Sequence, residues 1–421
     1  MTEDNWYQLD TSALIYPAIL SPDQASVYRL SCLLKETVDE VILQAALNAA
    51  LQRFPYFKVK IKKGAFWFYF EQNEKPFSIQ PEANFPCRML NQKNNQDYLF
   101  TITWFENKIS LEVFHVMADG TGGMEFLKSI VFYYLLLAGK PVQSEGIIKT
   151  LETKPNEEEI ENSFLRYYDP LIAPHRSSGR AVHYTGTPLP QEHSRAIHGI
   201  MSTKSILDLV HQNNATITEY FTAILIWDYF DMLKDLPNQD QMVCISVPIN
   251  LRKIFPSQTL RNFTFFINVG DKLTNRNEDF NTLLEKVKQQ MQDLRKKEHI
   301  LPDMNPNVTA EKSMIMRAAP LQLKKSVLKQ AHRILGDDLF TMTLSNMGPV
   351  QIPASMKPYI ERFDFGLGTS PKIPTNLSVC SFDDVLSAVF SSSIQEKNIE
   401  KSFFRFLSEK GIDITIQTSE G

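Results

Sequence analysis

One histidine stands in the setting that best suits acid–base chemistry. His115 closes an apolar stretch of strand-like character, Asp119 follows four residues later, and Gly120 comes next. An imidazole, with an ordinary pKa of about 6.5, can take a proton from a hydroxyl or an amine near neutral pH. Gly120 permits a tight turn that a Cβ would obstruct. The pattern predicts a general base at a strand end, with Asp119 paired either with the histidine or with a distant arginine.

The elements that must position His115 follow from the spacing of the apolar residues around it. Two strands over 98–105 and 109–116 form a predicted hairpin that runs directly into the histidine. A helix over 124–137 follows the Thr-Gly-Gly turn. The base would therefore lie between a strand and a helix, where a side chain can point into a cleft.

The rest of the chain predicts more strands and helices of both kinds. A capping box is expected at Thr37 and Glu40, and helix caps are expected at Ser202 and Thr218. The other predicted strands are 28–34, 59–61, 66–70, 196–201, 242–249, 263–269, 339–344, 377–382 and 385–390, and the later helices are 279–298 and 399–410. Short turns join many of these strands, which predicts an α/β (α+β) fold with mixed sheets and helices on one face.

A change in composition divides the chain. Residues 151–195 hold several prolines, an acidic run at 157–159 and little periodicity, so they are predicted to be a linker or crossover. This places an N-terminal lobe, which carries the histidine motif, at 1–150 and a C-terminal lobe at 196–421.

Composition and charge disfavour several classes of protein. The chain has 421 residues and a formal charge of −4, which is unlike a protein that binds nucleic acid over a broad surface. Its four cysteines are far apart, so neither a disulfide framework nor a zinc site is expected. The longest apolar run, 130–138, is far shorter than the ~20 residues of a membrane span. With an acidic, polar N-terminus, a cytoplasmic protein is predicted.

Four segments share an order and spacing found in one superfamily. They are Phe-His-Val-Met-Ala-Asp-Gly at 114–120, Val-Pro-Ile-Asn-Leu-Arg at 247–252, Arg-Asn-Phe with Asn-Val-Gly between 261 and 270, and Ser-Asn-Met-Gly at 345–348. Together they resemble the acyltransferase superfamily of chloramphenicol acetyltransferase, the condensation domains of peptide synthetases and stand-alone alcohol acyltransferases. The nearest resemblance is to bacterial alcohol acetyltransferase-like proteins.

The resemblance implies two chloramphenicol acetyltransferase-like lobes, each a mixed sheet with helices on one face, and an active-site tunnel between them. It implies an acyl-CoA co-substrate and a small alcohol or amine as acceptor. His115 would be the general base, and Asp119 would pair with Arg252 to hold the turn in shape. Ser345 and Asn346 would lie near the tunnel and help to hold the oxyanion or the substrate.

Two departures from the family pattern bear on the function. Condensation domains commonly carry a second histidine where this chain has Phe114, which argues against condensation of two carrier-bound substrates. Plant relatives carry Asp-Phe-Gly-Trp-Gly, and this chain has Asp-Phe-Gly-Leu-Gly at 364–368. The favoured hypothesis is an acyl-CoA-dependent O-acyltransferase with no acyl-enzyme, no metal and no bound cofactor. A condensation-type domain served by an acyl carrier protein, and a non-catalytic binding protein with the same fold, remain as alternatives.

Weaker signals do not change this hypothesis. Basic residues at 295–297 and 324–325 could meet the phosphates of coenzyme A, although such charges are usually a solvated helix face. Histidines at 175, 183, 193 and 198 match no standard metal-site spacing. The identity of the acceptor, the acyl length and the oligomeric state do not follow from the sequence.

Overall fold

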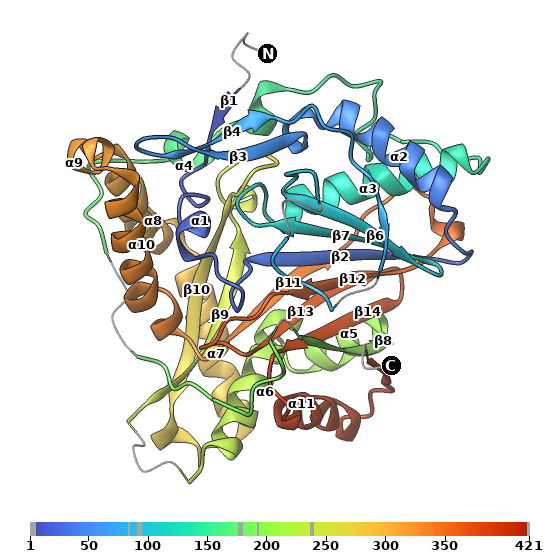
Figure 1. The fold of residues 1–421 in the computed structure, drawn as a ribbon. Helices are drawn as coiled ribbons and strands as arrows, with labels where there is room; N and C mark the ends of the chain where they lie inside the picture. Colours follow the sequence, from blue (N-terminus) through green and yellow to red (C-terminus); the bar gives the residue numbers. More distant parts are fainter. Residues whose placement is uncertain are drawn as a thin grey trace.

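Two mixed β-sheets carry the structure, and helices cover each of them (Figure 1). The computed structural model describes residues 6–82, 85–90, 95–175, 180–191, 193–235 and 240–418. The predicted class, with two lobes built on mixed sheets, is confirmed.

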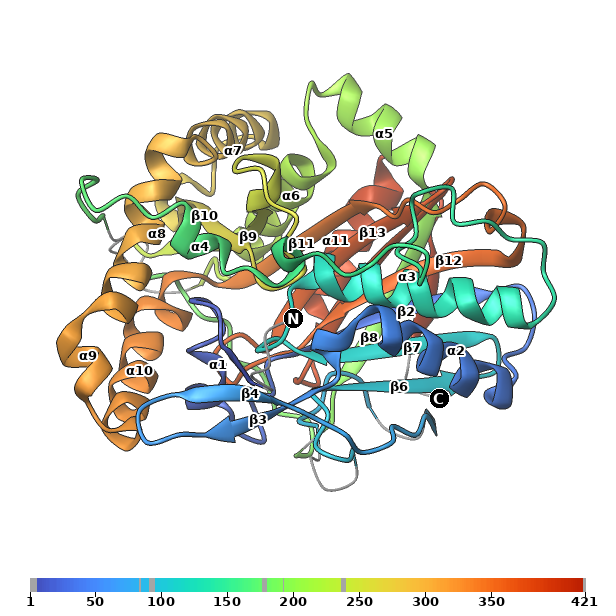
Figure 2. The ribbon, with the colours of Figure 1, turned by 90° about the horizontal axis from the view of Figure 1, so that it is seen from above.

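The first sheet has five strands in the order β12-β2-β7-β6-β5. Their bounds are Ile360–Leu367, Val27–Leu34, Lys108–Phe114, Phe100–Phe105 and Gln80–Pro81. All neighbours are antiparallel except β5 and β6. Helices α2 (Glu40–Arg53) and α3 (Gly120–Leu137) pack on each other above this sheet (Figure 2). The predicted hairpin that ends at the histidine is β6–β7.

A small three-stranded sheet lies beside the first one. Its strands are β1 (Trp6–Gln8), β4 (Phe68–Gln72) and β3 (Val59–Lys63), in the order β1-β4-β3. The β3–β4 hairpin was predicted with its turn at Lys63-Gly64. Strand β3 in fact extends to Lys63, and the turn spans residues 64–67, where the N–H of Gly64 donates to the carbonyl of Trp67 at 2.9 Å.

The second sheet has seven strands in the order β10-β9-β11-β13-β14-β8-β15. Their bounds are Thr264–Lys272, Met242–Asn250, Met342–Pro349, Thr375–Phe382, Val385–Ser392, Arg195–Ser202 and Thr415–Thr418. Strand β11 runs parallel to β9 and to β13, and the other pairs are antiparallel. Helices α5 (Thr203–Gln212), α6 (Ile217–Met232), α7 (Phe280–Leu294) and α11 (Asn398–Glu409) belong to this half of the molecule.

Two helix starts differ from prediction. The N-cap of α2 is Asp39, whose carboxylate accepts from two backbone N–H groups, so the capping box expected at Thr37 is wrong. Helix α6 is capped by Thr216, which forms a complete capping box, and not by Thr218. Both errors arise because several polar residues precede each helix, and only geometry selects the one that reaches the free N–H groups.

Helices α8 (Lys297–Lys312), α9 (Met314–Ala318) and α10 (Leu321–Leu335) follow α7. The predicted helix over 279–298 is in fact two helices, because α7 ends at Leu294 and α8 begins at Lys297. Pro302 and Pro306 lie inside α8, so a rule that ends helices at proline does not predict it. None of the helices in the described ranges is both long and apolar enough to cross a bilayer.

The crossover is anchored to the first lobe by a buried acidic residue. Glu159 lies in a short 3-10 helix, η2 (Glu157–Ile160), and forms a bidentate ion pair with Arg53 at 2.7 and 2.9 Å. Lys149 adds a contact of 2.8 Å. The acidic run that suggested a solvated linker therefore contains a fixed point of the fold.

Strand β12 joins the two halves. It pairs with β2 along its whole length, from Ile360 opposite Leu34 to Leu367 opposite Tyr28, and also packs against β13 and β14 of the second sheet. A Cβ on residue 368 would lie 2.7 Å from the carbonyl oxygen of Val27, so the glycine there permits this close approach. The first sheet is thus completed by a strand from the second half of the chain.

Asp364 holds β12 to the second sheet through a buried polar cluster. Its carboxylate accepts from Ser387 of β14 at 2.6 Å, and it pairs with Arg362 at 3.1 Å and with His198 of β8 at 3.4 Å. Burial favours a raised pKa for Asp364, but the contacts with His198, Arg362 and Ser387 outweigh it and hold that pKa below its ordinary value. The segment 364–368 therefore has a structural role between the sheets.

Replacing Asp364 by asparagine should destabilise the fold, because the buried guanidinium of Arg362 would lose the charge that compensates its burial. With this guanidinium left unpaired, we expect the free energy of unfolding to fall by about 3 kcal/mol, measured by urea denaturation. Asp383→Asn is the matched control, since Asp383 forms an exposed pair with Lys357 in a left-handed backbone position that asparagine tolerates. Equal stability of the two variants would contradict this account of the cluster.

Candidate active site

His115 directly follows β7, and its ring is fixed on three sides. Its backbone N–H donates to the carbonyl of Ser26 at 2.9 Å. Tyr16, from the short helix α1 (Tyr16–Ile19), stacks on the imidazole with ring centroids 4.8 Å apart, and Tyr28 meets it edge-on at 5.3 Å. Nδ1 lies 2.9 Å from Oδ1 of Asn262. Nε2 makes no hydrogen bond within the described part of the chain.

The expected ion pair between Asp119 and Arg252 is present. Nη1 of Arg252 lies 2.8 Å from Oδ2 of Asp119, and Nη2 lies 3.3 Å from Oδ1. The rest of the guanidinium donates to the carbonyls of Thr259 and Arg261 at 2.8 and 2.6 Å. The pair joins the turn after β7 to the loop between β9 and β10. Asp119 does not bond the imidazole directly, which was the other arrangement open to it.

Asp119 also organises the backbone around itself. As N-cap of α3 it accepts from the N–H groups of Thr121 and Gly122, and its Oδ2 accepts from the N–H of Phe263 and the hydroxyl of Thr264 at 2.8 and 2.9 Å. The side chain is only 1% exposed. Burial favours a raised pKa for Asp119, but Arg252 and these donors outweigh it, so the pKa lies below its ordinary value.

The glycines that follow Asp119 allow close packing. A Cβ on Gly122 would lie 1.9 Å from the carbonyl oxygen of Leu260, and one on Gly123 would lie 2.6 Å from the hydroxyl of Tyr28. The N–H groups of Thr121, Gly122 and Gly123 already donate to Asp119. These three N–H groups are therefore not free to bind a phosphate.

Ser345 and Asn346 lie on β11, whose end reaches the same turn. The Cε atom of Met347 lies 3.1 Å from the position a Cβ on Gly120 would take. The amide of Asn346 donates to Thr218 at 3.0 Å and accepts from the N–H of Gly348 at 2.8 Å. No hydrogen bond joins Ser345 or Asn346 to His115 among the described residues, and their contact with substrate stays a prediction.

Two of the basic residues considered for coenzyme A phosphates, Lys324 and Lys296, have partners within the chain. Lys324 is 1% exposed; its Nζ donates to the carbonyl of Phe66 at 2.8 Å and lies 3.6 Å from the centre of the Trp67 ring. Burial lowers its pKa. Lys296 pairs with Asp293 at 2.8 Å. Lys324 therefore cannot reach a phosphate in this conformation.

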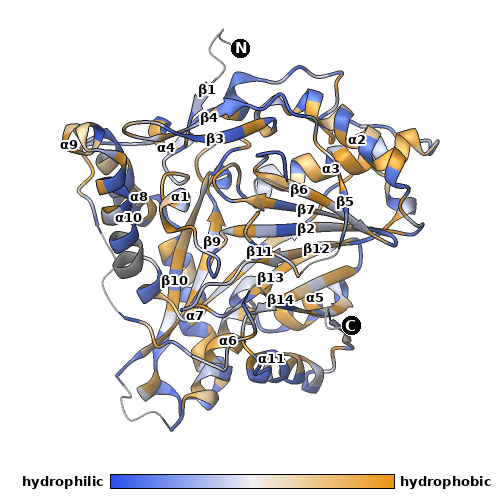
Figure 3. Cartoon of the chain, viewed as in Figure 1, coloured by the Kyte–Doolittle hydropathy of each residue, from blue (hydrophilic) through white to orange (hydrophobic). Residues whose placement is uncertain are grey.

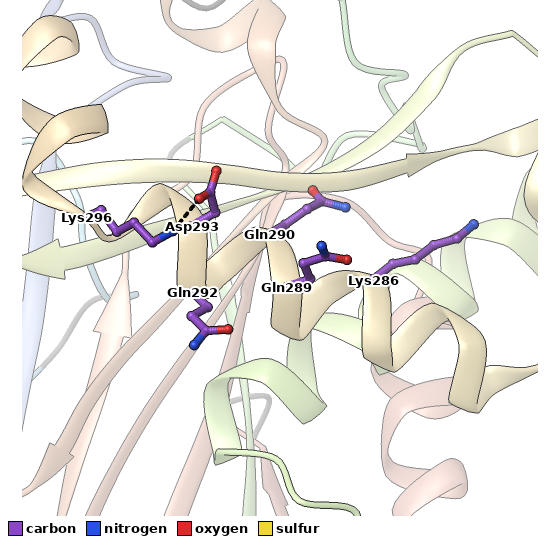
Figure 4. Close-up of a pocket in the computed structure, with 6 residues that line it drawn as sticks. All are labelled: Lys286, Gln289, Gln290, Gln292, Asp293 and Lys296. Atoms are coloured by element: carbon purple, nitrogen blue, oxygen red, sulfur yellow. Dashed lines mark hydrogen bonds and ion pairs between the residues drawn. The ribbon is translucent and has the colours of Figure 1, made fainter.

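A groove of about 400 Å³ runs along the outer face of α7, and Figure 4 shows the side chains that line it. Gln290 in this groove bonds to both backbone groups of Gly270, and Lys286 pairs with Asp271 and Glu278. No lining residue contacts His115, so the groove is separate from the candidate active site. In the ranges described, no three His, Cys, Asp or Glu side chains are grouped so that they could hold a metal ion.

Sequence reasoning missed three residues that contact the imidazole: Tyr16, Tyr28 and Asn262. Tyr28 was expected only as a residue of a strand. Asn262 lies within a segment that carries the family resemblance, but nothing in that segment says which polar side chain turns toward the histidine. Tyr16 lies in a four-residue helix that is too short to give a periodic signal.

Solved structures with the same fold include TRI3 and TRI101, two proteins from Fusarium. The chain is similar to TRI3, a trichothecene 15-O-acetyltransferase from Fusarium sporotrichioides, with 12% identity, a TM-score of 0.61, and coverage of 96% of this chain and 94% of the other. It is also similar to F. graminearum TRI101 in its complex with coenzyme A and deoxynivalenol, with 10% identity, a TM-score of 0.61 and coverage of 97% and 99%.

The fold is shared with condensation domains as well. The first condensation domain of the CDA synthetase matches with 14% identity and a TM-score of 0.60, over 97% of this chain and 96% of that one. No protein-family model and no curated protein sequence matches the chain. The matches define the fold of chloramphenicol acetyltransferase-like and condensation-domain acyltransferases and select no subfamily within it.

Removing either partner of the Asp119–Arg252 pair should strand a buried charge. We expect Asp119→Ala and Arg252→Ala each to lower the free energy of unfolding by about 3–5 kcal/mol. The double variant should lose less than the sum of the two, because no charge is left alone. Urea denaturation of the four proteins measures the coupling. Lys140→Ala, which breaks an exposed pair with Glu36, is the control and should cost under ~1 kcal/mol. If the losses in the two single variants simply add in the double variant, the two side chains do not stabilise the fold as an ion pair.

Proposed function

We propose that the chain is an acyl-CoA-dependent acyltransferase that transfers an acyl group to a hydroxyl or amine of a small molecule. The observation that carries the proposal is the hydrogen bonding of the His115 ring. Its Nδ1 is occupied by Asn262, whereas Nε2 has no partner in the described structure. A histidine so oriented can accept a proton from an acceptor that approaches Nε2. The family resemblance suggests an alcohol acetyltransferase-like enzyme, and the shared fold supports the acyltransferase class.

In the proposed mechanism, His115 acts as general base in a ternary complex. Nε2 takes the proton of the acceptor hydroxyl as its oxygen attacks the thioester carbonyl. The tetrahedral intermediate then collapses, the C–S bond breaks, and the leaving thiolate of coenzyme A takes the proton from the imidazolium. The base is returned neutral, so no group is consumed.

The absence of an acyl-enzyme is also part of the proposal. A thiol nucleophile must be deprotonated to attack, which requires a low pKa. Burial instead raises the pKa of all four cysteines. Cys32, Cys244 and Cys380 are also buried from solvent. These thiols are therefore unsuited to form a covalent intermediate.

Coenzyme A is favoured as the donor carrier because a protein of the same fold has been solved with it bound. The tunnel between the lobes, the roles of Ser345 and Asn346, and a cytoplasmic location belong to the same proposal. A protein that only binds a ligand would not need a histidine kept free at Nε2, which speaks against the non-catalytic alternative.

His115→Ala should lower kcat by about 10²–10⁴-fold while the fold stays intact, because the general base is lost. The assay follows free thiol from a panel of acyl-CoA donors with a mixed pool of alcohols and amines, and mass spectrometry identifies the acylated product. Circular dichroism and the unfolding midpoint check the fold.

His211→Ala is the control, since His211 is exposed on α5 and outside the candidate site. Its kcat should equal that of the unchanged protein. Near-normal turnover of His115→Ala would contradict the assignment of His115 as the general base. Transfer only from an acyl carrier protein would replace coenzyme A as the donor, and saturable binding without product would favour the binding-protein alternative.

A further inference from the structure

A buried chain of hydrogen bonds extends from the imidazole away from Nε2. Oδ1 of Asn262 lies 2.9 Å from Nδ1 of His115, and Nδ2 of Asn262 donates to Oδ2 of Asp10 at 3.0 Å. Asn262 is 2% exposed and Asp10 is fully buried. The three residues come from different parts of the chain: the N-terminal segment, the end of β7 and the loop before β10.

The protonation state of Asp10 decides which way the amide of Asn262 points. A carboxylate only accepts hydrogen bonds, so an ionised Asp10 faces the NH₂ group and turns the amide oxygen toward the histidine. The amide oxygen of Asn262 can only accept a hydrogen bond. In the neutral imidazole Nδ1 must then carry the proton, and Nε2 must be unprotonated. A protonated Asp10 could reverse the amide, which would put the proton on Nε2.

The hydrogen-bond geometry around Asp10 suits the carboxylate, because each contact described for its two oxygens comes from a donor. Nε of Arg261 lies 3.6 Å from its Oδ2, and the N–H of Ala13 donates to its Oδ1 at 2.8 Å. Burial leaves the pKa of Asp10 above its ordinary value, and Arg261 with the donors of Asn262 and Ala13 limits that rise without cancelling it. The same N-terminal segment also supplies Tyr16, which stacks on the imidazole.

We infer that Asn262 and Asp10 are positioning residues that fix His115 in the Nδ1–H tautomer and so keep Nε2 available as the base. This inference rests on the proposed function for its catalytic consequence, but the tautomer itself can be observed without any turnover.

The test uses the whole protein labelled with ¹⁵N-histidine, with the resonances of His115 assigned by comparison with His115→Gln. In the unchanged protein, the neutral imidazole should carry its proton on Nδ1. In Asp10→Asn, the new amide can donate to Oδ1 of Asn262 and reverse it, so the Nε2–H tautomer should become populated. Asn262→Ala should leave a mixture of the two.

Kinetics give the second readout. A wrong tautomer removes the base without removing substrate contacts, so kcat of Asp10→Asn should fall by roughly 10²–10⁴-fold with KM little changed. Asn305→Ala is the control, because it removes another buried asparagine whose Nδ2 donates to the carbonyl of Asp169 far along the chain. It should keep both the tautomer and kcat.

An Nε2–H tautomer in the unchanged protein, or an unaltered Nδ1–H tautomer in both Asp10→Asn and Asn262→Ala, would overturn the inference. A tautomer change without detectable acyl transfer by the unchanged protein would support the inference and count against the proposed function instead.

A second observation concerns the outer surface of α9 and α10. Between Glu311 and Asp337 the sequence holds six Lys or Arg residues and no Asp or Glu, although the whole chain has a formal charge of −4. Met314 and Ile315 of α9 are 85% and 82% exposed, and Leu323 of α10 is 59% exposed. Figure 3 marks α9 as hydrophobic, and Figures 1 and 2 show it at an outer edge of the molecule.

The tip of the β3–β4 hairpin belongs to the same surface. The N–H of Leu321 donates to the carbonyl of Ala65, and Nζ of the buried Lys324 bonds the carbonyls of Phe66 and Arg317. Phe66 is 49% exposed. We call this surface the α9–α10 platform; its exposed apolar residues are Phe66, Met314, Ile315 and Leu323, and its exposed cations are Lys62, Lys63, Lys312, Arg317 and Lys329.

We propose that the α9–α10 platform docks on an anionic lipid surface. Apolar side chains that protrude among lysines and arginines suit a bilayer interface, where the cations meet lipid phosphates and the apolar groups enter the acyl boundary. The protruding tip favours a soft bilayer over a peptide, which would need a groove. Helix α10 packs against α1, whose Tyr16 contacts His115, so the platform lies one element away from the site.

Sedimentation with vesicles tests this proposal independently of any activity. The protein should bind vesicles of phosphatidylcholine mixed with phosphatidylserine, bind pure phosphatidylcholine much less, and dissociate at high salt. Changing Met314→Glu together with Ile315→Glu should weaken binding by at least about 10-fold, because two charges oppose insertion. Val41→Glu, at a 73% exposed position on α2, is the matched control and should bind normally.

Failure to bind anionic vesicles, or equal binding by the Met314/Ile315 double variant, would overturn the proposal. Binding of an acidic acyl carrier protein through these residues without vesicle binding would overturn it as well, since the platform would then serve a protein partner.

Discussion

The carboxylate of Asp119 is the constraint on which the candidate site depends. It is almost fully buried, and it accepts from five donor groups: the guanidinium of Arg252, two N–H groups of α3, the N–H of Phe263 and the hydroxyl of Thr264. A buried carboxylate is costly unless each lone pair is satisfied. Here the donors come from both halves of the chain, so the carboxylate cannot be satisfied unless the two halves meet in one geometry.

This geometry also orients the histidine. The loop that meets Asp119 at Phe263 and Thr264 carries Asn262 one residue earlier, and Asn262 is the partner of Nδ1 of His115. The base and its orienting group are therefore fixed by the same contact between the halves. A small displacement of this loop would change the ring's hydrogen bond and the start of α3 together. The glycine at 122 avoids such a displacement, because a Cβ there would lie 1.9 Å from the carbonyl oxygen of Leu260 in the same loop.

Local patterns in the sequence predicted much of this arrangement. Period-2 apolar residues indicated β2, β6 and β7, and the resemblance placed Asp119 and Arg252 together although 133 residues separate them. Periodicity could not predict that β12 joins the first sheet, because pairing between distant strands leaves no mark on either strand alone. Asn262 and Tyr16 were missed for the same reason, since side-chain direction in a loop or a single helical turn depends on tertiary contacts.

The distribution of charge separates two kinds of polar residue in this protein. Around His115, the buried Asp10, Asn262, Arg261, Asp119 and Arg252 bond to one another and to backbone groups, and such networks specify one arrangement only when every member is satisfied. On the α9–α10 platform, the exposed cations stand among apolar side chains with no acidic residue in the same stretch of sequence. A polar network that is satisfied within the fold fixes the orientation of a side chain, whereas exposed cations in excess over acidic residues are available to a partner. The orientation of His115 therefore depends on hydrogen bonds inside the fold, whereas the proposed lipid contact depends on the cations and apolar groups that the surface exposes.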